Sequence, residues 1–449
     1  MRDRRWLVAL VLIAIAGLAL RVAYVLITKN PRHLGGDDFY YHHGANLLVD
    51  GRGFVDPIQL LQFHRSTPGA AHPPGYIVAL ALPSLLRLRT VLDHQMWSCL
   101  IGAGTIVVVG FAGKEIAGPR AGLVAAAIAA VYPNIWFYDS VVMSETLILF
   151  TTALTILIAY RFARQPSARL AIGLGVSVGI TALTRAESIL LIPLLLVPLA
   201  LWLRATVWRR RLQLLAISVG ATLLTIAPWV GYNLARFERP VYLSSNLELT
   251  LLSANCDQTY YGPFLGFWAF QCGTRFTPPR GDASVQAAFD RSKVREYVSD
   301  HKSRVPVVVL AREARTWGFF NANQQITIDQ IEGKELNTSR IALAMYYALV
   351  AFGVAGVVAL RRRRVPLTPL LAVLGAVALT VGFVYGTTRF RAPAEVALVL
   401  LGSVGIDAAI RRVGALVRDR RNARMADEPE PSIEAAGVET RALRILRPS

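Results

Sequence analysis

The chain has 449 residues, of which 54% are hydrophobic, and its mean hydropathy is +0.44. Several apolar stretches are long enough to cross a bilayer, so these values exclude an ordinary soluble domain and indicate a polytopic membrane protein. The formal net charge of +19 would suggest nucleic-acid binding in a soluble protein. Here the arginines lie in clusters between the apolar stretches, as the positive-inside rule predicts, so no nucleic-acid partner is expected.

The first apolar segment, residues 6–27, follows Arg2, Arg4 and Arg5. A basic start is typical of a signal peptide, but this apolar run is too long and no small-residue cleavage site follows it. The segment therefore predicts a membrane anchor rather than a cleaved leader.

The apolar runs and the arginine clusters between them decide the expected topology. The run at 74–86 has about 13 residues, short of the ~20 that a span needs, and it opens with two prolines. If this run stays on one face, every arginine cluster is cytoplasmic; if it crosses, the clusters at 114–120, 161–169 and 361–364 fall outside. We therefore predict ten transmembrane helices with both termini in the cytoplasm, at 6–27, 95–113, 119–133, 143–160, 169–184, 187–203, 212–232, 339–360, 366–386 and 394–410.

This topology predicts one transmembrane catalytic domain over residues 1–410. It also predicts a cytoplasmic tail over 411–449, basic at first and then disordered from Met425 on. The unusual polar residues collect on the outer face, in a first loop at 29–73 and a large loop at 233–338.

The large loop contains two stretches, 284–299 and 305–320, whose apolar residues recur at roughly helical spacing. We expect them to form helices that lie on the membrane surface over the site. Cys256 and Cys272 share this loop, and a disulfide between them is expected if the loop is extracytoplasmic. Cys99 lies in an apolar helix and is expected to be inert packing.

The first loop concentrates titratable side chains, namely Asp37, Asp38, Tyr40, Tyr41, His33, His42, His43, His64 and His72. Transfer of a group onto a hydroxyl needs a carboxylate that accepts the proton, and Asp37 and Asp38 are candidates. Alternatively, Asp38, and less so Asp37, forms an Asx turn or caps the helix expected at 39–49. Tyr41 and His72 are candidate substrate-binding residues. The alternative for His72 is binding of a divalent metal, which the sequence allows but does not require; no clean ligand spacing accompanies it, so we assign no metal site.

Glu145 opens a predicted span near the outer surface. A carboxylate there is costly unless it is paired, caps the helix or has a function, so Glu145 is a second candidate catalytic residue. The alternative is a favourable interaction with the helix dipole. Asp139, a few residues earlier, is expected to be a solvated loop residue.

Three arginines on the outer face run against the charge bias of the topology and therefore need a reason. Arg185, close to Glu187, interrupts a mostly apolar stretch, and Arg389 and Arg391 precede the last span. A guanidinium at headgroup depth can bind a lipid phosphate with two parallel N–H groups. The alternative for Arg185 is an ordinary hairpin with an internal ion pair to Glu187.

The order of these motifs resembles the membrane glycosyltransferases of the GT-C fold. Within them it is most similar to the bacterial branch of the protein O-mannosyltransferase and aminoarabinose transferase superfamily, glycosyltransferase family 39 and its relatives. The resemblance covers roughly residues 6–410 and rests on the order of the motifs GDDFYYHHGANLLVDGRGF, HPPGY, GKEIAGPRAG, YPNIWFYDSVVMSETL, GVSVGITALTRAE, PWVGYN and RFRAP.

The resemblance implies an all-α fold with external juxtamembrane helices, at the plasma membrane, and an inverting transfer on the extracytoplasmic face. The donor would be a sugar on a polyprenyl phosphate, and the acceptor a glycan, lipid or protein of the envelope. No nucleotide-binding fingerprint appears, which fits a lipid-linked donor. By position, Asp37 corresponds to the general base, Asp38 to the acidic residue after it, Glu145 to the second acidic position, Arg185 to a basic residue near the lipid phosphate, and Arg389 and Arg391 to the late basic motif.

Two other classes of membrane protein are alternatives. A transporter or flippase has a similar number of spans, but it is expected to show matching halves and ionisable residues at mid-membrane. A lipid-linked-sugar polymerase or ligase of another fold would use the same donors and external arginines. The polar residues collect on one outer face and no halves match, which argues against a transporter or flippase. The two carboxylates of the first loop favour the GT-C interpretation over the polymerase or ligase.

Overall fold

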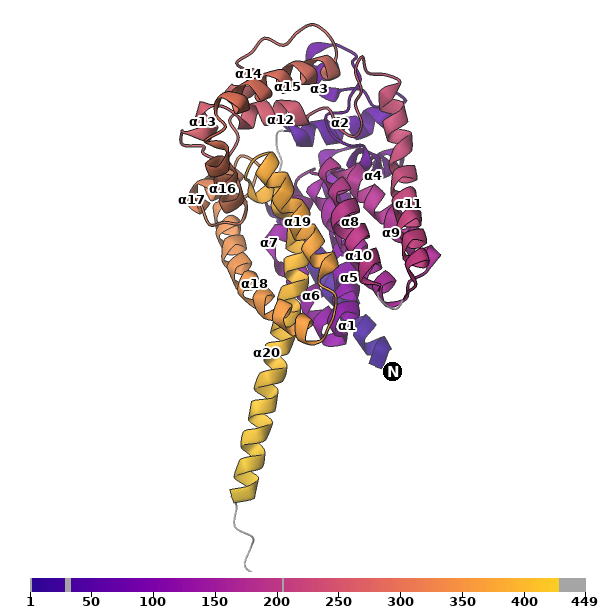
Figure 1. Ribbon diagram of the computed structural model, residues 1–449, viewed down its shortest axis with the longest axis vertical. Helices are drawn as coiled ribbons and strands as arrows, with labels where there is room; N and C mark the ends of the chain where they lie inside the picture. The colour runs from indigo at the N-terminus through magenta and orange to yellow at the C-terminus, as the bar shows by residue number, and fades with distance from the viewer. Residues whose placement is uncertain (1, 29–33, 204–205, 428–449) are drawn as a thin grey trace, which may run out of the picture.

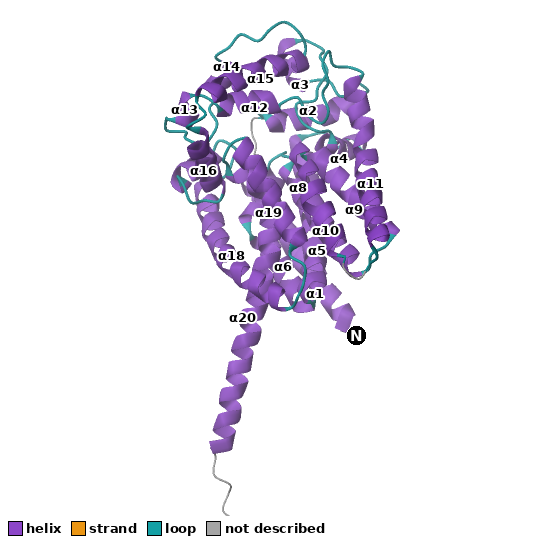
Figure 2. Ribbon diagram, viewed as in Figure 1, coloured by secondary structure: helices purple, strands orange, loops and turns teal. Residues whose placement is uncertain are grey.

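The structure is a computed structural model that describes residues 2–28, 34–203 and 206–427. Within these residues it contains helices, turns and one isolated bridge, but no β-strand (Figure 2). The predicted all-α class is therefore confirmed.

A bundle of long helices forms the body of the molecule (Figure 1). Among the described residues six helices are long and apolar enough to cross a membrane, or seven if α6 and the segment after it, bent by 72°, are one span. Three further predicted spans correspond to the shorter apolar segments Ala168–Thr184, Ala186–Trp202 and Thr368–Phe383. The total of ten stays a prediction. The long helices and the bent segment are α1 (Arg2–Thr28), α5 (Val91–Ala117), α6 (Pro119–Val131), α7 (Pro133–Trp136), η1 (Phe137–Ser140), α8 (Glu145–Arg164), α11 (Trp208–Leu234), α18 (Leu336–Arg362) and α20 (Ala392–Asp427).

One of the shorter apolar segments is not a regular helix. Pro193 and Pro198 remove two backbone donors from it, and the segment contains a π-helical turn between a 3₁₀ turn and a final α-helix. The shorter elements are α9 (Ala168–Thr184), η2 (Ala186–Leu190), η3 (Ile192–Leu196), α10 (Val197–Trp202), α19 (Thr368–Phe383) and η4 (Thr388–Arg391).

The C-terminal tail begins as a continuation of the last long helix. Helix α20 extends through residues 411–427 without a break and projects from the bundle (Figure 1). The basic part of the tail is thus helical up to Asp427, and the disorder expected near Met425 and beyond stays a prediction. Residues 428–449 lie outside the described residues, and so does His33 of the first loop.

A layer of short helices covers the end of the bundle farthest from the projecting tail (Figure 1). They come from the first loop and from the large loop, which the sequence places on one face. The helices predicted near 284–299 and 305–320 are confirmed, and Cys256 is disulfide-bonded to Cys272. This cap comprises α2 (Asp37–Val49), α3 (Pro57–Phe63), α12 (Leu247–Ala254), α13 (Asp257–Tyr260), α14 (Phe270–Thr274), α15 (Ala283–Asp300), α16 (Val305–Thr316) and α17 (Ala322–Asp329).

The short helix α4 (Gly75–Leu85) has 11 residues, which at 1.5 Å per residue is about half of the hydrocarbon thickness. The turn that follows it returns to α2. Arg89 donates to the Asp50 carboxylate at 2.7 Å, and the Asn46 side chain donates to the Arg89 carbonyl at 3.1 Å. Both ends of α4 therefore lie near the cap, in agreement with a helix that does not cross.

Cysteine labelling tests this topology. We expect a membrane-impermeant thiol reagent to reach cysteines introduced at Arg65 and at Leu92 from the same side of the membrane. The background is low because Cys99 is buried and the other two cysteines are paired. If the cysteine at position 92 reacts only after permeabilisation, α4 crosses the membrane and the ten-span topology is wrong.

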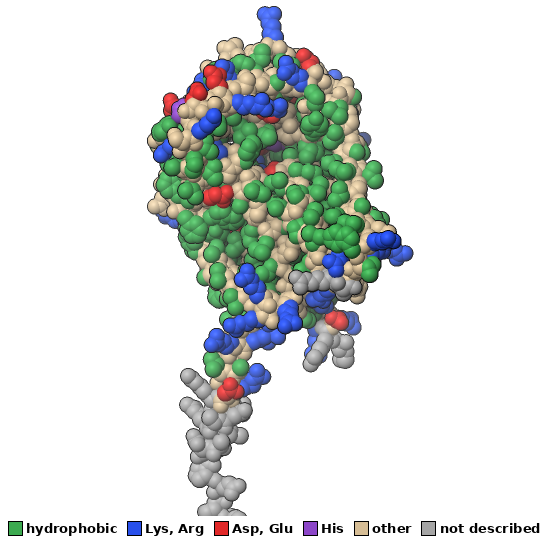
Figure 3. Space-filling view, viewed as in Figure 1, with side chains coloured by type: hydrophobic (Ala, Val, Ile, Leu, Met, Phe, Trp, Pro, Cys, Tyr) green, Lys and Arg blue, Asp and Glu red, His purple; other side chains and the backbone are tan. Residues whose placement is uncertain are grey.

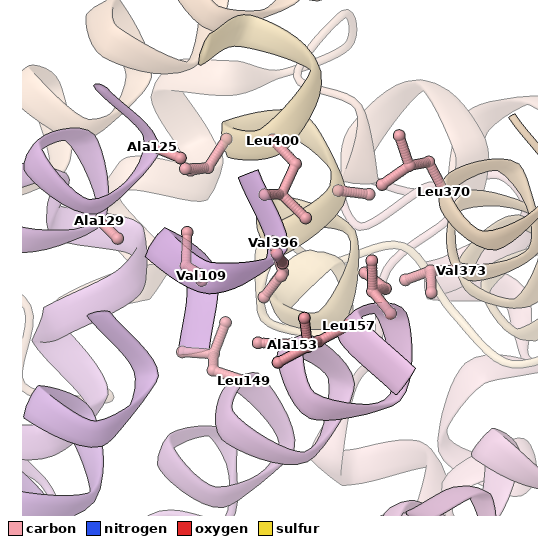
Figure 4. Packing of buried hydrophobic residues seen from close by; sticks show 14 of the residues in the cluster. Val109, Ala125, Ala129, Leu149, Ala153, Leu157, Leu370, Val373, Val396 and Leu400 are labelled. Carbon is pink, nitrogen blue, oxygen red and sulfur yellow. The ribbon is translucent and has the colours of Figure 1, made fainter. Parts of the chain in front are cut away.

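The core lies where α5, α6, α8, α19 and α20 meet (Figure 4). Alanines such as Ala125, Ala129 and Ala153 face valines and leucines of the neighbouring helices. Small residues let helix backbones approach closely, which favours packing inside a membrane. At Gly122 an added Cβ would lie 2.6 Å from the Gly110 carbonyl oxygen, so α5 and α6 are in near-backbone contact.

Asp139 is not a solvated loop residue, and that expectation is wrong. The residue is 1% exposed, and its Oδ2 accepts a hydrogen bond from Arg21 Nε of α1 at 2.7 Å. Arg21 also donates to backbone carbonyls at the end of α6. Gly102 leaves room for the pair, because a Cβ there would lie 1.9 Å from Asp139 Oδ2. The carboxylate is buried because a cation inside the bundle compensates its charge.

We expect Asp139→Leu to lower the free energy of unfolding by about 3–5 kcal/mol, because it leaves the Arg21 guanidinium buried and unpaired. The double variant Arg21→Met/Asp139→Leu is expected to recover most of that loss, since apolar replacement of a buried pair is often neutral. Thermal unfolding of the purified protein in one detergent measures both. A single variant as stable as the wild type would show that the pair does not hold α1 in place.

Candidate active site

The two neighbouring aspartates at the start of α2 point in different directions and make different contacts. Gly36, at φ +102°, turns the chain into the helix, a conformation that favours glycine. The Oδ1 of Asp38 then accepts from the backbone N–H groups of Gly35 at 3.0 Å and of Phe39 at 2.8 Å. Asp38 is thus occupied in closing the turn, which is the alternative that the sequence left open for it.

Asp37 extends away from that turn toward the bundle. Its Oδ2 accepts from Arg389 Nη2 at 2.6 Å, and its Oδ1 lies 3.1 Å from His72 Nε2. Burial alone would raise the pKa of Asp37, but the electrostatic effects of His72 and Arg389 hold it well below its usual range. Asp37 is therefore an ionised carboxylate, still 29% exposed, that can accept a hydrogen bond from a hydroxyl.

Glu145, the first residue of α8, is fully buried and shares the Arg389 guanidinium with Asp37. Its Oε1 accepts from Arg185 Nη1 at 2.5 Å and also from Arg389 Nε. The second oxygen, Oε2, has no hydrogen-bond partner among the described residues. Arg185 also donates to Glu187 at 2.7 Å, so the hairpin ion pair considered from the sequence is present.

Aromatic rings form the wall beside Asp37. The ring of Tyr41 lies 4.8 Å from that of His72 and 5.1 Å from that of Tyr76, measured between centroids. The Tyr40 hydroxyl accepts from the backbone N–H of Ala71 and so fixes the loop that carries His72. These contacts hold the His72 ring against Asp37.

Sequence reasoning missed a group of charged residues just before α18. Glu332 forms an ion pair with Arg389 at 3.7 Å, and Lys334 lies 3.6 Å from Asp329 and 3.4 Å from the Tyr138 hydroxyl. Burial raises the pKa of Glu332 to about 7, with Arg389 acting against it. The dense run of charges from Asp329 to Glu335, directly before a predicted span, is the sequence signal that could have identified this group.

Arg391 does not join this cluster. It is 1% exposed, donates to Glu395 at 2.6 Å and to the Thr316 carbonyl at 2.8 Å, and its guanidinium lies 3.7 Å from the centroid of the Tyr346 ring. These contacts join η4, α20, α16 and α18. We therefore omit Arg391 from the candidate site.

The candidate site thus consists of Asp37, His72, Glu145, Arg185 and Arg389, with Tyr41 and Glu332 beside them. In the part of the chain that the structure describes, no group of three or more His, Cys, Asp and Glu side chains is arranged to hold a metal ion. Figure 3 shows the surface hollowed just beneath the cap, at the upper edge of the apolar belt.

The chain is similar to one family model and to several solved structures. A family model described as dolichyl-phosphate-mannose-protein mannosyltransferase matches residues 71–232, about a third of the chain. No curated protein matches the chain.

Several solved structures are similar to the chain at low sequence identity, and those with a TM-score above 0.5 share its architecture. The oligosaccharyltransferase AglB from Archaeoglobus fulgidus, in complex with an inhibitory peptide and a dolichol-phosphate, has a TM-score of 0.57 at 15% identity, covering 99% of this chain and 54% of that chain. An oligosaccharyltransferase from the same archaeon, tethered with an acceptor peptide, gives 0.56 at 17% identity, covering 98% of this chain and 54% of that chain. ArnT from Cupriavidus metallidurans, bound to undecaprenyl phosphate, gives 0.44 at 15% identity, covering 87% and 77%. The chain spans about half the length of the archaeal oligosaccharyltransferase.

Proposed function

This chain has the GT-C glycosyltransferase fold, and from that premise we propose that it is a membrane glycosyltransferase that uses a sugar on a polyprenyl phosphate. The acceptor is a hydroxyl of a cell-envelope glycan, lipid or protein, and the reaction takes place on the extracytoplasmic face of the plasma membrane. The observation that carries the proposal is the ionised Asp37 carboxylate, which lies at one end of an apolar bundle in contact with the Arg389 guanidinium. Arg389 in turn shares the Glu145 carboxylate with Arg185.

The donor phosphate is assigned to Arg185 and Arg389. Both guanidiniums lie at the end of the bundle where α8 begins, which is the depth of a lipid headgroup if α8 spans the membrane. A small crevice lined in part by Leu191, Val377 and Phe390 includes Glu187, so apolar surface lies next to the carboxylate that pairs with Arg185. The AglB complex with a dolichol-phosphate supports a lipid carrier in this fold.

In the proposed reaction Asp37 acts as the general base. It accepts the proton of the acceptor hydroxyl while the hydroxyl oxygen forms a bond to the anomeric carbon. The bond from that carbon to the phosphate oxygen breaks on the opposite side, which inverts the anomeric configuration. The polyprenyl phosphate leaves with the electron pair, and the guanidiniums stabilise its added charge.

The GT-C fold excludes the alternative of a polymerase or ligase built on another fold. No contact among the described residues favours a transporter or flippase.

The test is a transfer assay with purified full-length protein in lipid nanodiscs. Decaprenyl-phosphate mannose is the donor probe, and the released decaprenyl phosphate is measured with and without an envelope extract as acceptor source. The proposal expects release that depends on the acceptor. Movement of the intact lipid between leaflets, without cleavage of the sugar, would instead identify a flippase.

A further inference from the structure

A second polar site lies at the opposite end of the bundle from the candidate active site. Helix α8 connects the two, since Glu145 is its first residue and Arg164 its last. Twenty residues of α-helix measure about 30 Å, which is the thickness of the hydrocarbon core. Arg164 therefore lies at headgroup depth in the leaflet opposite the candidate site.

At this end the chain forms an open pocket of about 690 Å³. Its walls come from the end of α8, the end of α10 and the turn between α18 and α19. Arg164, Arg361 and Arg364 supply cations, and Trp202, Leu203 and Pro366 supply apolar surface. The volume falls within the range of pockets that bind small ligands.

The cations of the pocket are only partly neutralised. Arg164 pairs with Glu115 at 3.0 Å. Arg361 and Arg364 are exposed, and within the described residues neither guanidinium has a hydrogen-bond or ion-pair partner. The pocket therefore carries two unpaired positive charges beside an apolar wall.

We propose that this pocket binds the phosphodiester headgroup of an anionic phospholipid from the leaflet opposite the candidate active site. Basic pockets between transmembrane helices are sites for such headgroups. The apolar wall and the 40% exposed Trp202 suit the glycerol and the first acyl carbons, because tryptophan favours the membrane interface. A free phosphate ion would use the guanidiniums but not this wall.

Arg364 offers a clean way to remove a charge. It has φ +55° directly after α18, in the left-handed region where glycine is favoured and other residues are strained. Arg364→Gly therefore deletes a pocket cation while relieving the backbone. Arg362 and Arg363 lie at the same helix end and are exposed, but they do not line the pocket, so they provide a matched loss of charge.

The experiment measures lipid binding to the purified full-length protein by native mass spectrometry, with phosphatidylglycerol and phosphatidylcholine as probes. We expect selective binding of phosphatidylglycerol, reduced about tenfold to thirtyfold in Arg361→Gln/Arg364→Gly and little changed in Arg362→Gln/Arg363→Gln. An equal loss in the two double variants would overturn the proposal, because general attraction to the leaflet would then explain binding.

A competition arm distinguishes a lipid headgroup from a soluble anion. Millimolar inorganic phosphate should leave bound phosphatidylglycerol in place, because it uses the guanidiniums but not the apolar wall. If inorganic phosphate displaces the lipid from the wild-type protein, the lipid assignment is wrong. The readout does not depend on glycosyl transfer, so it stands or fails independently of the proposed function.

Discussion

Asp37→Asn is expected to lower the rate of sugar transfer by about 10²–10⁴-fold, the loss typical of removing a general base. The asparagine can still donate to or accept from its neighbours, but it cannot take the proton of the acceptor hydroxyl. Binding of undecaprenyl phosphate should be retained or strengthened, because the variant has one negative charge fewer beside Arg389. Transfer kinetics and lipid binding, measured on the same preparation, separate these effects.

Asp38→Asn is the matched control, since it changes the adjacent carboxylate in the same way. The asparagine Oδ1 can accept the two backbone hydrogen bonds that Asp38 Oδ1 accepts, so helix α2 should begin as before. We expect transfer close to that of the wild type. If Asp38→Asn is the inactive variant and Asp37→Asn is active, Asp38 is the base and the proposed role of Asp37 is wrong.

The sequence predicted that the unusual charged residues gather on one face of the bundle. It predicted less well which contacts they make with one another. Asp37, Glu145, Arg185 and Arg389 come from four separate segments, yet the structure brings them together. They could be predicted because each is costly in an apolar chain, and because the arginine clusters fix the face on which each one lies.

The sequence could not predict in which direction the side chains of two nearby arginines point. Arg389 and Arg391 lie two positions apart in the 3₁₀ turn η4, where successive residues rotate by about 120°. One side chain therefore points to Asp37 and Glu145, and the other to Glu395. Asp139 was missed for a different reason, since its partner Arg21 is far away in the sequence and appears only when α1 packs on the bundle.

The second large effect concerns Arg389 and Arg185. Each guanidinium already contacts carboxylates, so a donor phosphate has to share it with Asp37, Glu145, Glu187 or Glu332. We expect Arg389→Gln to reduce undecaprenyl-phosphate affinity and transfer together by at least tenfold, because a charge-assisted bond contributes about 1.5–3 kcal/mol. Arg389→Lys should keep part of both, since it retains the charge but loses the planar pair of donors.

A purely structural role for Arg185 predicts different changes in stability and lipid affinity than phosphate binding does. Variants of Arg185 therefore distinguish the two roles. Arg185→Gln removes one of the two cations that compensate the buried Glu145, so some loss of stability is expected in either case. The double variant Arg185→Gln/Glu145→Gln removes that imbalance. If Arg185 only neutralises Glu145, the double variant should recover both the melting temperature and undecaprenyl-phosphate affinity. If Arg185 binds the phosphate, stability should recover while affinity stays low. Arg391→Gln is the control, because its loss should lower stability without changing the affinity of the folded protein.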